Sequence, residues 1–149
     1  MLPWPYRLYF WGVHGVFAEM VFTALWEFAV SGKLTLFGFS SIWSFFTYGF
    51  GTFFFAEPFR SYLVGRGVPL WIRCLLYVPM AYAGEFGFGM ILSYFNACPW
   101  DYTHFDYDVA GLITLEYAPV WLLAGAYFEY IMSAMTSLEE LPRWRRKVE

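Results

Sequence analysis

The chain has 149 residues, of which 60% are hydrophobic, 26% are aromatic and only 14% are charged, with a formal net charge of −3. Soluble proteins have about 25% charged residues, and a soluble fold of this length would lack the polar surface needed to cover so many aromatic side chains. The composition therefore excludes an ordinary soluble domain and predicts an all-α integral membrane protein. We expect membrane lipids as its surroundings and no nucleic acid partner.

Four apolar stretches are long enough to cross the hydrocarbon of a bilayer, which takes roughly 20 helical residues. Breakers such as Ser31-Gly32, Pro58, Pro69 and Pro99 separate them. The sequence thus predicts a four-helix transmembrane bundle in one domain, residues 1–136, followed by a basic cytoplasmic tail, residues 137–149. The predicted spans cover about residues 8–30, 36–56, 70–95 and 112–135.

Lysine and arginine residues predict the orientation. All nine except Lys33 lie near the N-terminus, around the connection between the second and third spans, or in the tail. Under the positive-inside rule both termini are then cytoplasmic, and the segment 95–111 faces outward or into an organelle lumen. We expect a multi-pass protein of the secretory pathway or the plasma membrane, and no motif names the organelle.

The first span contains three ionisable residues, His14, Glu19 and Glu27. An acidic side chain near the bilayer centre costs roughly 2.5–3.5 kcal/mol, so each needs a partner or a purpose. Glu19 and Glu27 can share one broad helix face. His14 borders Gly12 and Gly15, where another backbone can approach, and we expect its ring to form a hydrogen bond with a neighbouring helix; binding of a metal or a proton is the alternative.

The third span contains Glu85 with no basic residue nearby, because Arg73 lies about 18 Å away along the helix axis. Arg73 should instead lie at the cytoplasmic headgroups, or pair with Glu129 or Glu57 at a similar depth. Without a cation of its own, Glu85 is expected to bind a proton or a cation, or to be protonated and hydrogen-bonded.

Small residues in the same span, in the stretch GEFGFG, predict packing rather than phosphate binding. They lack the strand-turn-helix context of a phosphate-binding loop. Ala83 and Gly87 form a small-xxx-small pair, which is typical of helices whose backbones approach closely. We therefore expect a neighbouring helix to pack against this face.

The outer loop contains three aspartates and a histidine, namely Asp101, His104, Asp106 and Asp108. Clusters of oxygen ligands suit Ca²⁺, Mg²⁺ or Mn²⁺, and a histidine extends the range to Fe²⁺ or Zn²⁺. The spacing matches no standard ligand motif, so a divalent cation is a weakly supported candidate cofactor. The alternative is an interfacial belt of aromatic residues with ordinary turns, in which Asp108 caps the fourth helix.

Carboxylates at the outer ends of the spans lie beneath this loop. At about 1.5 Å per residue, Glu27, Glu85 and Glu116 all fall in the outer half of the membrane. We therefore predict an acidic recess on the outer side that binds a proton or a cation. Its candidate residues are Glu19, Glu27, Glu85, Glu116, Asp101, Asp106 and Asp108, with His14 and His104 as candidate metal or proton ligands.

Three stretches resemble the transmembrane protein 229 family: HGVFAEMVFTALWEF in the first span, RCLLYVPMAYAGEF in the third, and FNACPWDYTHFDYDVAGLITLEYA from the outer loop onward. That family of small polytopic proteins is similar in turn to bacterial membrane proteins described as ABC-transporter permeases of a type IV class. The resemblance covers about residues 6–130 and implies a multi-pass, permease-like membrane protein. It implies no catalytic residues, and a permease role would need a separate ATP-hydrolysing partner.

Three functions are compatible with these residues. The first is a transport-related protein or a subunit of a membrane complex, acting with further copies or partner subunits because four short helices scarcely enclose a conduction path. The second is a membrane enzyme acting on a lipid or small substrate, with Glu85 or Glu116 as general acid/base and Asp101, His104 and Asp106 holding a metal or the substrate. The third is a structural scaffold whose buried carboxylates are protonated. The first is our prediction.

Overall fold

The computed structural model describes residues 3–140, and these are mostly helical. The elements in chain order are α1 (Trp4–Ser31), α2 (Ile42–Gly51), the π-helical turn η1 (Thr52–Ala56), α3 (Glu57–Gly65), α4 (Leu70–Tyr94), β1 (Asp108–Val109), β2 (Ile113–Thr114), the 3-10 turn η2 (Leu115–Tyr117) and α5 (Ala118–Glu140). The all-α prediction is confirmed. The basic residues of the predicted tail, from Arg143 onward, lie outside the described residues.

Two of the described helices, α1 and α4, are long and apolar enough to cross a membrane, judged by length and composition. No other helix within residues 3–140 meets both conditions. This finding is compatible with insertion into a membrane. The arrangement of four spans stays a prediction.

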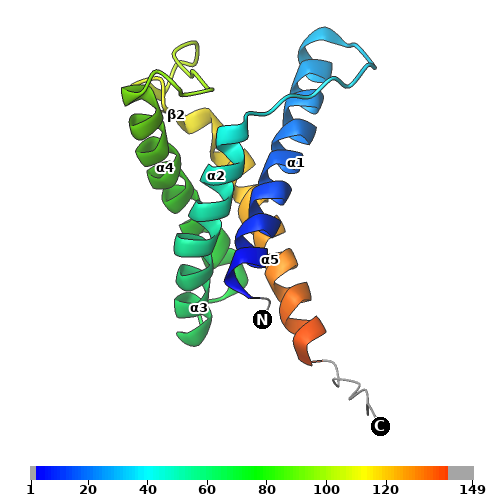
Figure 1. The fold of residues 1–149 in the computed structure, drawn as a ribbon, viewed down its shortest axis with the longest axis vertical. Coiled ribbons are helices and arrows are strands. Elements are labelled where there is room, and N and C mark those ends of the chain that lie inside the picture. The colour runs from blue at the N-terminus through cyan, green and yellow to red at the C-terminus, as the bar shows by residue number, and fades with distance from the viewer. Residues whose placement is uncertain (1–2, 141–149) are drawn as a thin grey trace.

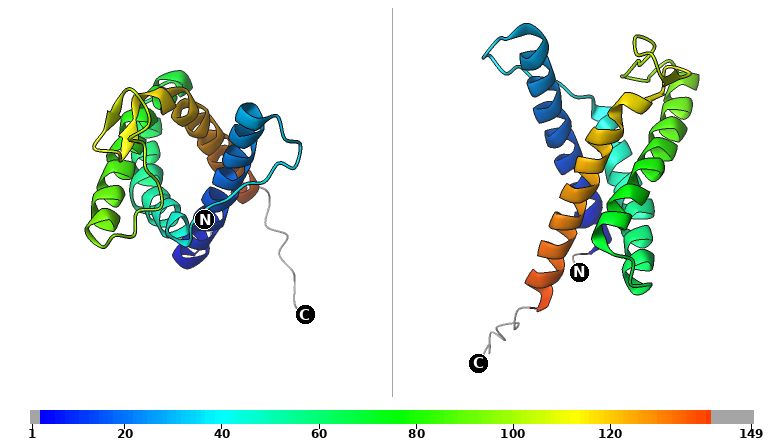
Figure 2. Two further views of the ribbon diagram at one scale, coloured as in Figure 1. Left: turned by 90° about the horizontal axis from the view of Figure 1, so that it is seen from above. Right: turned by 180° about the vertical axis from the view of Figure 1, so that it is seen from behind.

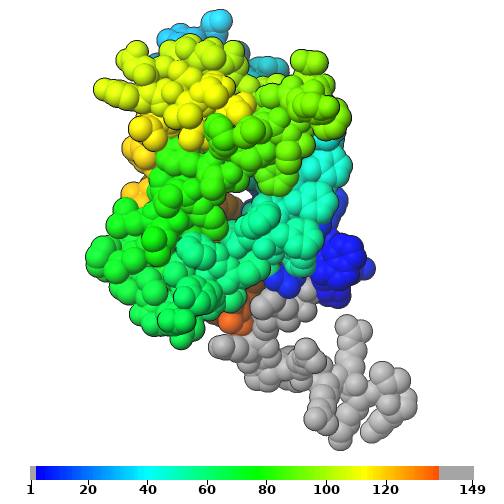
Figure 3. Space-filling view, turned by 90° about the vertical axis from the view of Figure 1, so that its left-hand side faces the viewer, coloured from blue at the N-terminus to red at the C-terminus, as the bar shows by residue number. Residues whose placement is uncertain are grey.

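The helices are arranged in two pairs. α1 packs along α2, and α4 packs along α5 (Figure 1). The two pairs lie close together near the chain termini and diverge toward the end that holds the β1–β2 hairpin, and from above the helices form an open ring (Figure 2). On one face α4 lies beside α2 and α3, with a narrow opening between them, and the hairpin loop covers the upper end (Figure 3). The helices are therefore farther apart at the hairpin end, where the loop fills part of the space between them.

The second predicted span is wrong at both ends. Residues 36–41 are not helical, since Leu36 has a φ of 47°, and α2 begins only at Ile42. The side chain of Ser41 accepts a hydrogen bond from the N–H of Trp43, which is how a serine starts a helix. Pro58 does not end the helix, and it directly follows the π-helical turn η1, where the regular α-helical hydrogen-bond pattern is already interrupted. Backbone angles stay helical through η1, so residues 42–65 form one continuous rod.

The fourth predicted span begins too early. Residues 112–117 form the end of a turn, β2 and the 3-10 turn η2 rather than α-helix, and α5 begins at Ala118. The cause is a tight turn before β2, in which Ala110 and Gly111 have φ values of 55° and 67° and Val109 pairs with Ile113. Glu116 therefore lies in a turn outside the helix.

Glycines of α1 and α2 permit close packing of these two helices. A Cβ atom at Gly12 would overlap Phe45, and a Cβ atom at Gly15 would overlap Tyr48. The prediction that another backbone approaches α1 is confirmed at Gly12, where the Phe45 carbonyl lies close, whereas the neighbour at Gly15 is the Tyr48 side chain. Gly49 of α2 lies against the backbone of α1 in the same way.

The packing predicted for Ala83 and Gly87 of α4 is wrong. Ala83 is exposed, and a Cβ atom at Gly87 would meet nothing within 4 Å. Gly89, two residues further on, is the packing glycine, because a Cβ atom there would lie 3.0 Å from Leu112 and 3.2 Å from Trp100. The outer loop, and not another long helix, covers this part of α4.

Candidate functional site

Near the chain termini, Glu129 of α5 lies at the centre of a buried ion-pair network. Its carboxylate accepts hydrogen bonds from Arg60 at 2.9 Å and from Arg73 at 2.7 and 3.1 Å. The hydroxyl of Tyr77 donates a further hydrogen bond at 2.6 Å. Of the two positions predicted for Arg73, pairing with a carboxylate at similar depth is confirmed, and the partner is Glu129.

A second buried carboxylate, Glu57, lies at the first residue of α3. It pairs with Arg7 of α1 and accepts a hydrogen bond of 2.5 Å from the ring N–H of Trp11. The ring of Trp11 contacts Phe128, which packs against Tyr77, so that aromatic rings join the two ion-pair networks. Both of these inner carboxylates thus have arginine partners and hold the helices together.

Two other carboxylates, Glu19 of α1 and Glu85 of α4, lie toward the diverging end. They are close enough for their charges to interact, and the Tyr48 side chain is near both. Glu19 also lies beside Ser40 and Ser44. Among residues 3–140, the ion pairs involve Glu57 and Glu129 alone, so neither Glu19 nor Glu85 has a basic partner there. We call these two carboxylates with Tyr48, Tyr102 and Trp121 the outer carboxylate site.

The two carboxylate oxygens of Glu85 differ in their surroundings. Oε1 accepts a hydrogen bond of 2.7 Å from the hydroxyl of Tyr102. Oε2 is buried and has no hydrogen-bond partner within the described chain. The ring N–H of Trp121 lies beside this carboxylate, but in the same part of the chain its nitrogen also has no partner in normal geometry. Glu85 therefore keeps one oxygen without a hydrogen bond in a buried position.

Aromatic rings of the outer loop pack against α1 across the diverging end. Tyr117 lies at the centre of this cluster, with ring centroids 5.2 Å from Phe105, 5.3 Å from Tyr102 and 5.5 Å from Phe22. Trp26 of α1 joins the cluster at 6.1 Å from Tyr117. The belt predicted for the loop is thus partly turned inward, and it joins the loop to α1.

Tyr102 connects this aromatic cluster to Glu85. Burial and the neighbouring charge of Glu85 raise the pKa of the Tyr102 hydroxyl, which therefore stays protonated and donates its hydrogen bond at neutral pH. The outer loop reaches the carboxylate site through this residue.

Two predicted members of the recess, Glu27 and Glu116, lie apart from Glu85. Glu27 is exposed on α1. Glu116 accepts hydrogen bonds from the hydroxyl of Thr114 and from the N–H of Tyr107, at 3.1 Å for the latter. These donors hold the pKa of Glu116 below its usual value and tie η2 to the outer loop.

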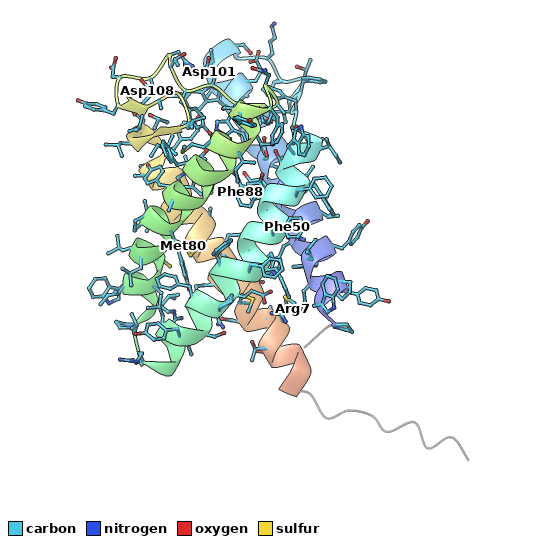
Figure 4. The ribbon with its side chains drawn as sticks, turned by 60° about the vertical axis from the view of Figure 1, so that its left-hand side comes forward. Arg7, Phe50, Met80, Phe88, Asp101 and Asp108 are labelled. Atoms are coloured by element: carbon cyan, nitrogen blue, oxygen red, sulfur yellow. The ribbon has the colours of Figure 1, made fainter. Side chains whose placement is uncertain are left out.

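Asp101 and Asp108 of the loop stabilise turns. Asp101 is exposed and accepts a hydrogen bond of 2.9 Å from the N–H of Thr103, and Asp106 is exposed as well. Asp108 accepts a hydrogen bond of 2.7 Å from the N–H of Gly111, so the prediction that it caps the fourth helix is wrong. Asp101 and Asp108 lie on the loop at the outer end of the molecule (Figure 4). The structure therefore places Glu19 and Glu85 within range of each other's charge, and it places the predicted aspartates on the loop.

The two histidines lie among aromatic rings. The ring of His14 lies 4.2 Å from Phe10 and 6.4 Å from Tyr127, and the described residues contain no hydrogen bond from it to a neighbouring helix. His104 is exposed and lies 4.4 Å from Phe105. Within the described part of the chain, no group of three His, Cys, Asp or Glu residues could hold a metal ion.

The hydrogen bond between Asp101 and Thr103 should depend on pH in a way that can be measured. The N–H of Thr103 holds the pKa of Asp101 below its ordinary value of 3.8. Because this pKa is lowered in the folded chain, the stabilisation of the turn is complete above pH 3.8 and is lost as the pH falls through the folded value. The amide resonance of Thr103 should therefore titrate with a midpoint below 3.8 and lose this titration in Asp101→Asn. A midpoint at or above that value would contradict the assigned hydrogen bond.

Sequence reasoning missed three members of the outer carboxylate site, Tyr48, Tyr102 and Trp121. Aromatic residues make up 26% of the chain, so the position of one tyrosine or tryptophan contains little information about a site. Only the segment around Tyr102 indicates a possible site in the sequence, because its polar and aromatic residues lie between two apolar stretches.

Neither a protein-family model nor a solved structure matches this chain.

Proposed function

We propose that this chain is a four-span, transport-related membrane protein that binds and releases a proton at Glu85. α1 and α4 have the length and composition of spans. Residues 42–65 and α5 are about 35 Å long, which is also enough to cross a bilayer. In this arrangement both termini are cytoplasmic and the outer loop is lumenal or extracellular, and further copies or partner subunits complete any conduction path.

The observation that supports a proton site is that Glu85 has no counter-charge among the described residues. Glu57 and Glu129 show the contrast, because each is buried together with arginine. A carboxylate that is buried without a cation is more stable when it is neutral, and binding a proton is the simplest way to neutralise it. Release of that proton becomes favourable when the site opens to water.

The donors around Glu85 favour a proton over a metal ion. Divalent cations of the Ca²⁺ or Mg²⁺ type prefer about six oxygen ligands. Here the neighbours include the hydroxyl of Tyr102 and the ring N–H of Trp121, and an N–H donor is not a ligand for a cation. The hydroxyl of Tyr102 lies between Glu85 and the outer loop, and we assign it the role of passing the proton.

The resemblance to the transmembrane protein 229 family supports the membrane part of this proposal. We propose membership of that family from the sequence motifs alone. The motifs include both Glu19 and Glu85 and continue through the loop that contains Tyr102.

The test is proton uptake by the purified chain in liposomes that contain a pH-sensitive dye. Glu85→Gln should abolish uptake and remove the carbonyl band of a protonated carboxylic acid from the infrared difference spectrum. The matched control is Glu27→Gln, which removes an exposed carboxylate and should leave both signals unchanged. Equal uptake by the two variants and the unsubstituted chain would contradict the proposal.

A structural role is the second candidate, because the hydrogen bond between Tyr102 and Glu85 joins the outer loop to α4. Glutamine can accept the same hydrogen bond from Tyr102. If Glu85 is only structural, it stays protonated throughout, so its carbonyl band should not change with pH, and Glu85→Gln should preserve folding. The pH dependence of this band separates the two candidates without a transport assay, because a proton that binds and is released makes the band titrate.

A further inference from the structure

Trp121 of α5 and Glu85 of α4 lie at one level of the bundle. At the inner end, the hydroxyl of Tyr77 on α4 donates a hydrogen bond of 2.6 Å to Glu129 on α5. Glu85 lies eight residues after Tyr77 on α4. Trp121 lies eight residues before Glu129 on α5. Because the two helices run in opposite directions (Figure 1), both steps lead outward by about 12 Å. The contact at the inner end therefore sets the level at which Trp121 lies beside Glu85.

The contact between these two residues contains a donor and an acceptor that are both unused. Within residues 3–140, the Nε1 atom of Trp121 and the Oε2 atom of Glu85 are buried and have no hydrogen-bond partner. The ring N–H of Trp121 lies beside the carboxylate. An indole N–H can only donate, and a carboxylate oxygen accepts. Burying either group without a partner is costly, and each is of the kind that the other needs. The two groups can therefore form a hydrogen bond with each other.

Whether this hydrogen bond forms depends on the charge of Glu85. The hydroxyl of Tyr102 donates to Oε1, so the proton of the neutral acid is expected on Oε2. A protonated Oε2 is itself a donor and opposes the N–H of Trp121, whereas an ionised Oε2 accepts from it. Tyr102 can donate to Oε1 in both states. Of the two donors, Trp121 is thus the one that distinguishes the ionised form from the neutral form.

We infer that the ring N–H of Trp121 stabilises the ionised form of Glu85 and thereby promotes release of its proton. A hydrogen bond to a charged acceptor is about twice as strong as one between neutral groups. The inference rests on the proposed proton binding at Glu85 and adds the residue that sets how tightly the proton is held. Trp121 does not carry the proton itself, because its ring N–H has no acceptor site.

The other groups around Glu85 do not take this role. The titratable side chains whose charges interact with it are Glu19 of α1, Tyr48 of α2, Tyr82 of α4, Tyr102 of the outer loop and Tyr117 of η2. Glu19 is a carboxylate, so its charge opposes ionisation of Glu85. The hydroxyl of Tyr82 donates to the carbonyl of Leu115 at 3.3 Å. Among the described residues Tyr102 alone donates a hydrogen bond to Glu85, and this leaves Oε2 for Trp121.

The first test is Trp121→Phe, which removes the N–H and keeps an aromatic ring on α5. The pH midpoint of the Glu85 carbonyl band in the infrared spectrum should rise by about one pH unit, because the ionised form loses a charge-assisted hydrogen bond. Trp43→Phe is the matched control, since Trp43 is 42% exposed on α2 and the same exchange there should leave the midpoint unchanged. An unchanged or lower midpoint in Trp121→Phe would overturn the inference, as would an equal shift in both variants.

The second test uses the unsubstituted chain and so guards against a variant that fails to fold. One indole N–H resonance in the nitrogen–proton correlation spectrum should move downfield with the same midpoint as the carbonyl band, and Glu85→Gln should abolish this movement. The signal of Trp121 is the one that is absent from Trp121→Phe. If the carbonyl band titrates and the Trp121 resonance does not, the inference fails and the proton site stands. If the band does not change with pH, the proposed function fails and the inference fails with it.

Discussion

Replacing Glu129 by glutamine should lower the free energy of unfolding by about 3 kcal/mol, because it leaves two buried guanidinium groups without a counter-charge. The side chains of Arg60, Arg73 and Glu129 are only 13%, 15% and 3% exposed, so water cannot replace the lost charge. Glutamine has nearly the same shape, so the loss reports the charge and not a cavity. Denaturant titration of the purified chain in mixed micelles measures this effect.

The control for this experiment is Glu27→Gln, since Glu27 is exposed and has no partner in the inner networks. It should change the free energy of unfolding by less than about 0.5 kcal/mol. Tyr77→Phe should have an intermediate effect of about 1 kcal/mol, because it removes one hydrogen bond and keeps the ring. Equal stabilities of the Glu129→Gln and Glu27→Gln variants would mean that the buried network does not hold the helices together.

Features that depend on depth along a helix could be predicted from the sequence. The pairing of Arg73 with a carboxylate followed from counting residues, because an arginine and a glutamate at equal depth on neighbouring helices can reach each other. The close approach at Gly12 and Gly15 followed from the missing side chains alone. The positions of α1 and α4 followed from the length of their apolar stretches.

Features that depend on turns could not be predicted in this way. The chain before α2 and before β2 has positive φ values at Leu36 and Ala110, which are unusual for residues other than glycine and interrupt the predicted helices there. Since Ala110 lies in the turn of the hairpin, Glu116 lies in a loop and bonds to Thr114 instead of entering the predicted recess. Which way a loop side chain points is equally hidden, and Tyr102 rather than Asp101 turned out to reach Glu85.

Buried carboxylates are stabilised differently at the two ends of the molecule. A buried carboxylate must be paired, hydrogen-bonded or neutral. Glu57 and Glu129 are paired with arginine at the end where the helix pairs converge, and this pairing fixes the helices there. Glu85 lies where the pairs diverge and is held by one hydrogen bond from a loop tyrosine. The inner end is therefore suited to holding the bundle, and the outer end to changing its protonation.

Packing of α1 against α2 is what positions Glu19 in the outer carboxylate site. A Cβ atom at Gly15 would overlap the stem of the Tyr48 side chain, which a rotation of the ring alone cannot relieve. Tyr48 lies near both Glu19 and Glu85. Any shift between the two helices at Gly15 therefore also moves a residue of the proposed proton site.

Gly15→Ala should consequently destabilise the chain by about 2 kcal/mol, the typical cost of adding a methyl group where no space exists. Gly87→Ala on α4 is the matched control, because a Cβ atom there meets nothing within 4 Å. Alanine is the better helix former, so this second variant should be as stable as the unsubstituted chain or more stable by up to about 1 kcal/mol. Thermal unfolding in micelles measures the difference, and proton uptake should fall in Gly15→Ala alone. Effects of the same sign and size in both variants would show that helix propensity, and not the contact between α1 and α2, decides the outcome.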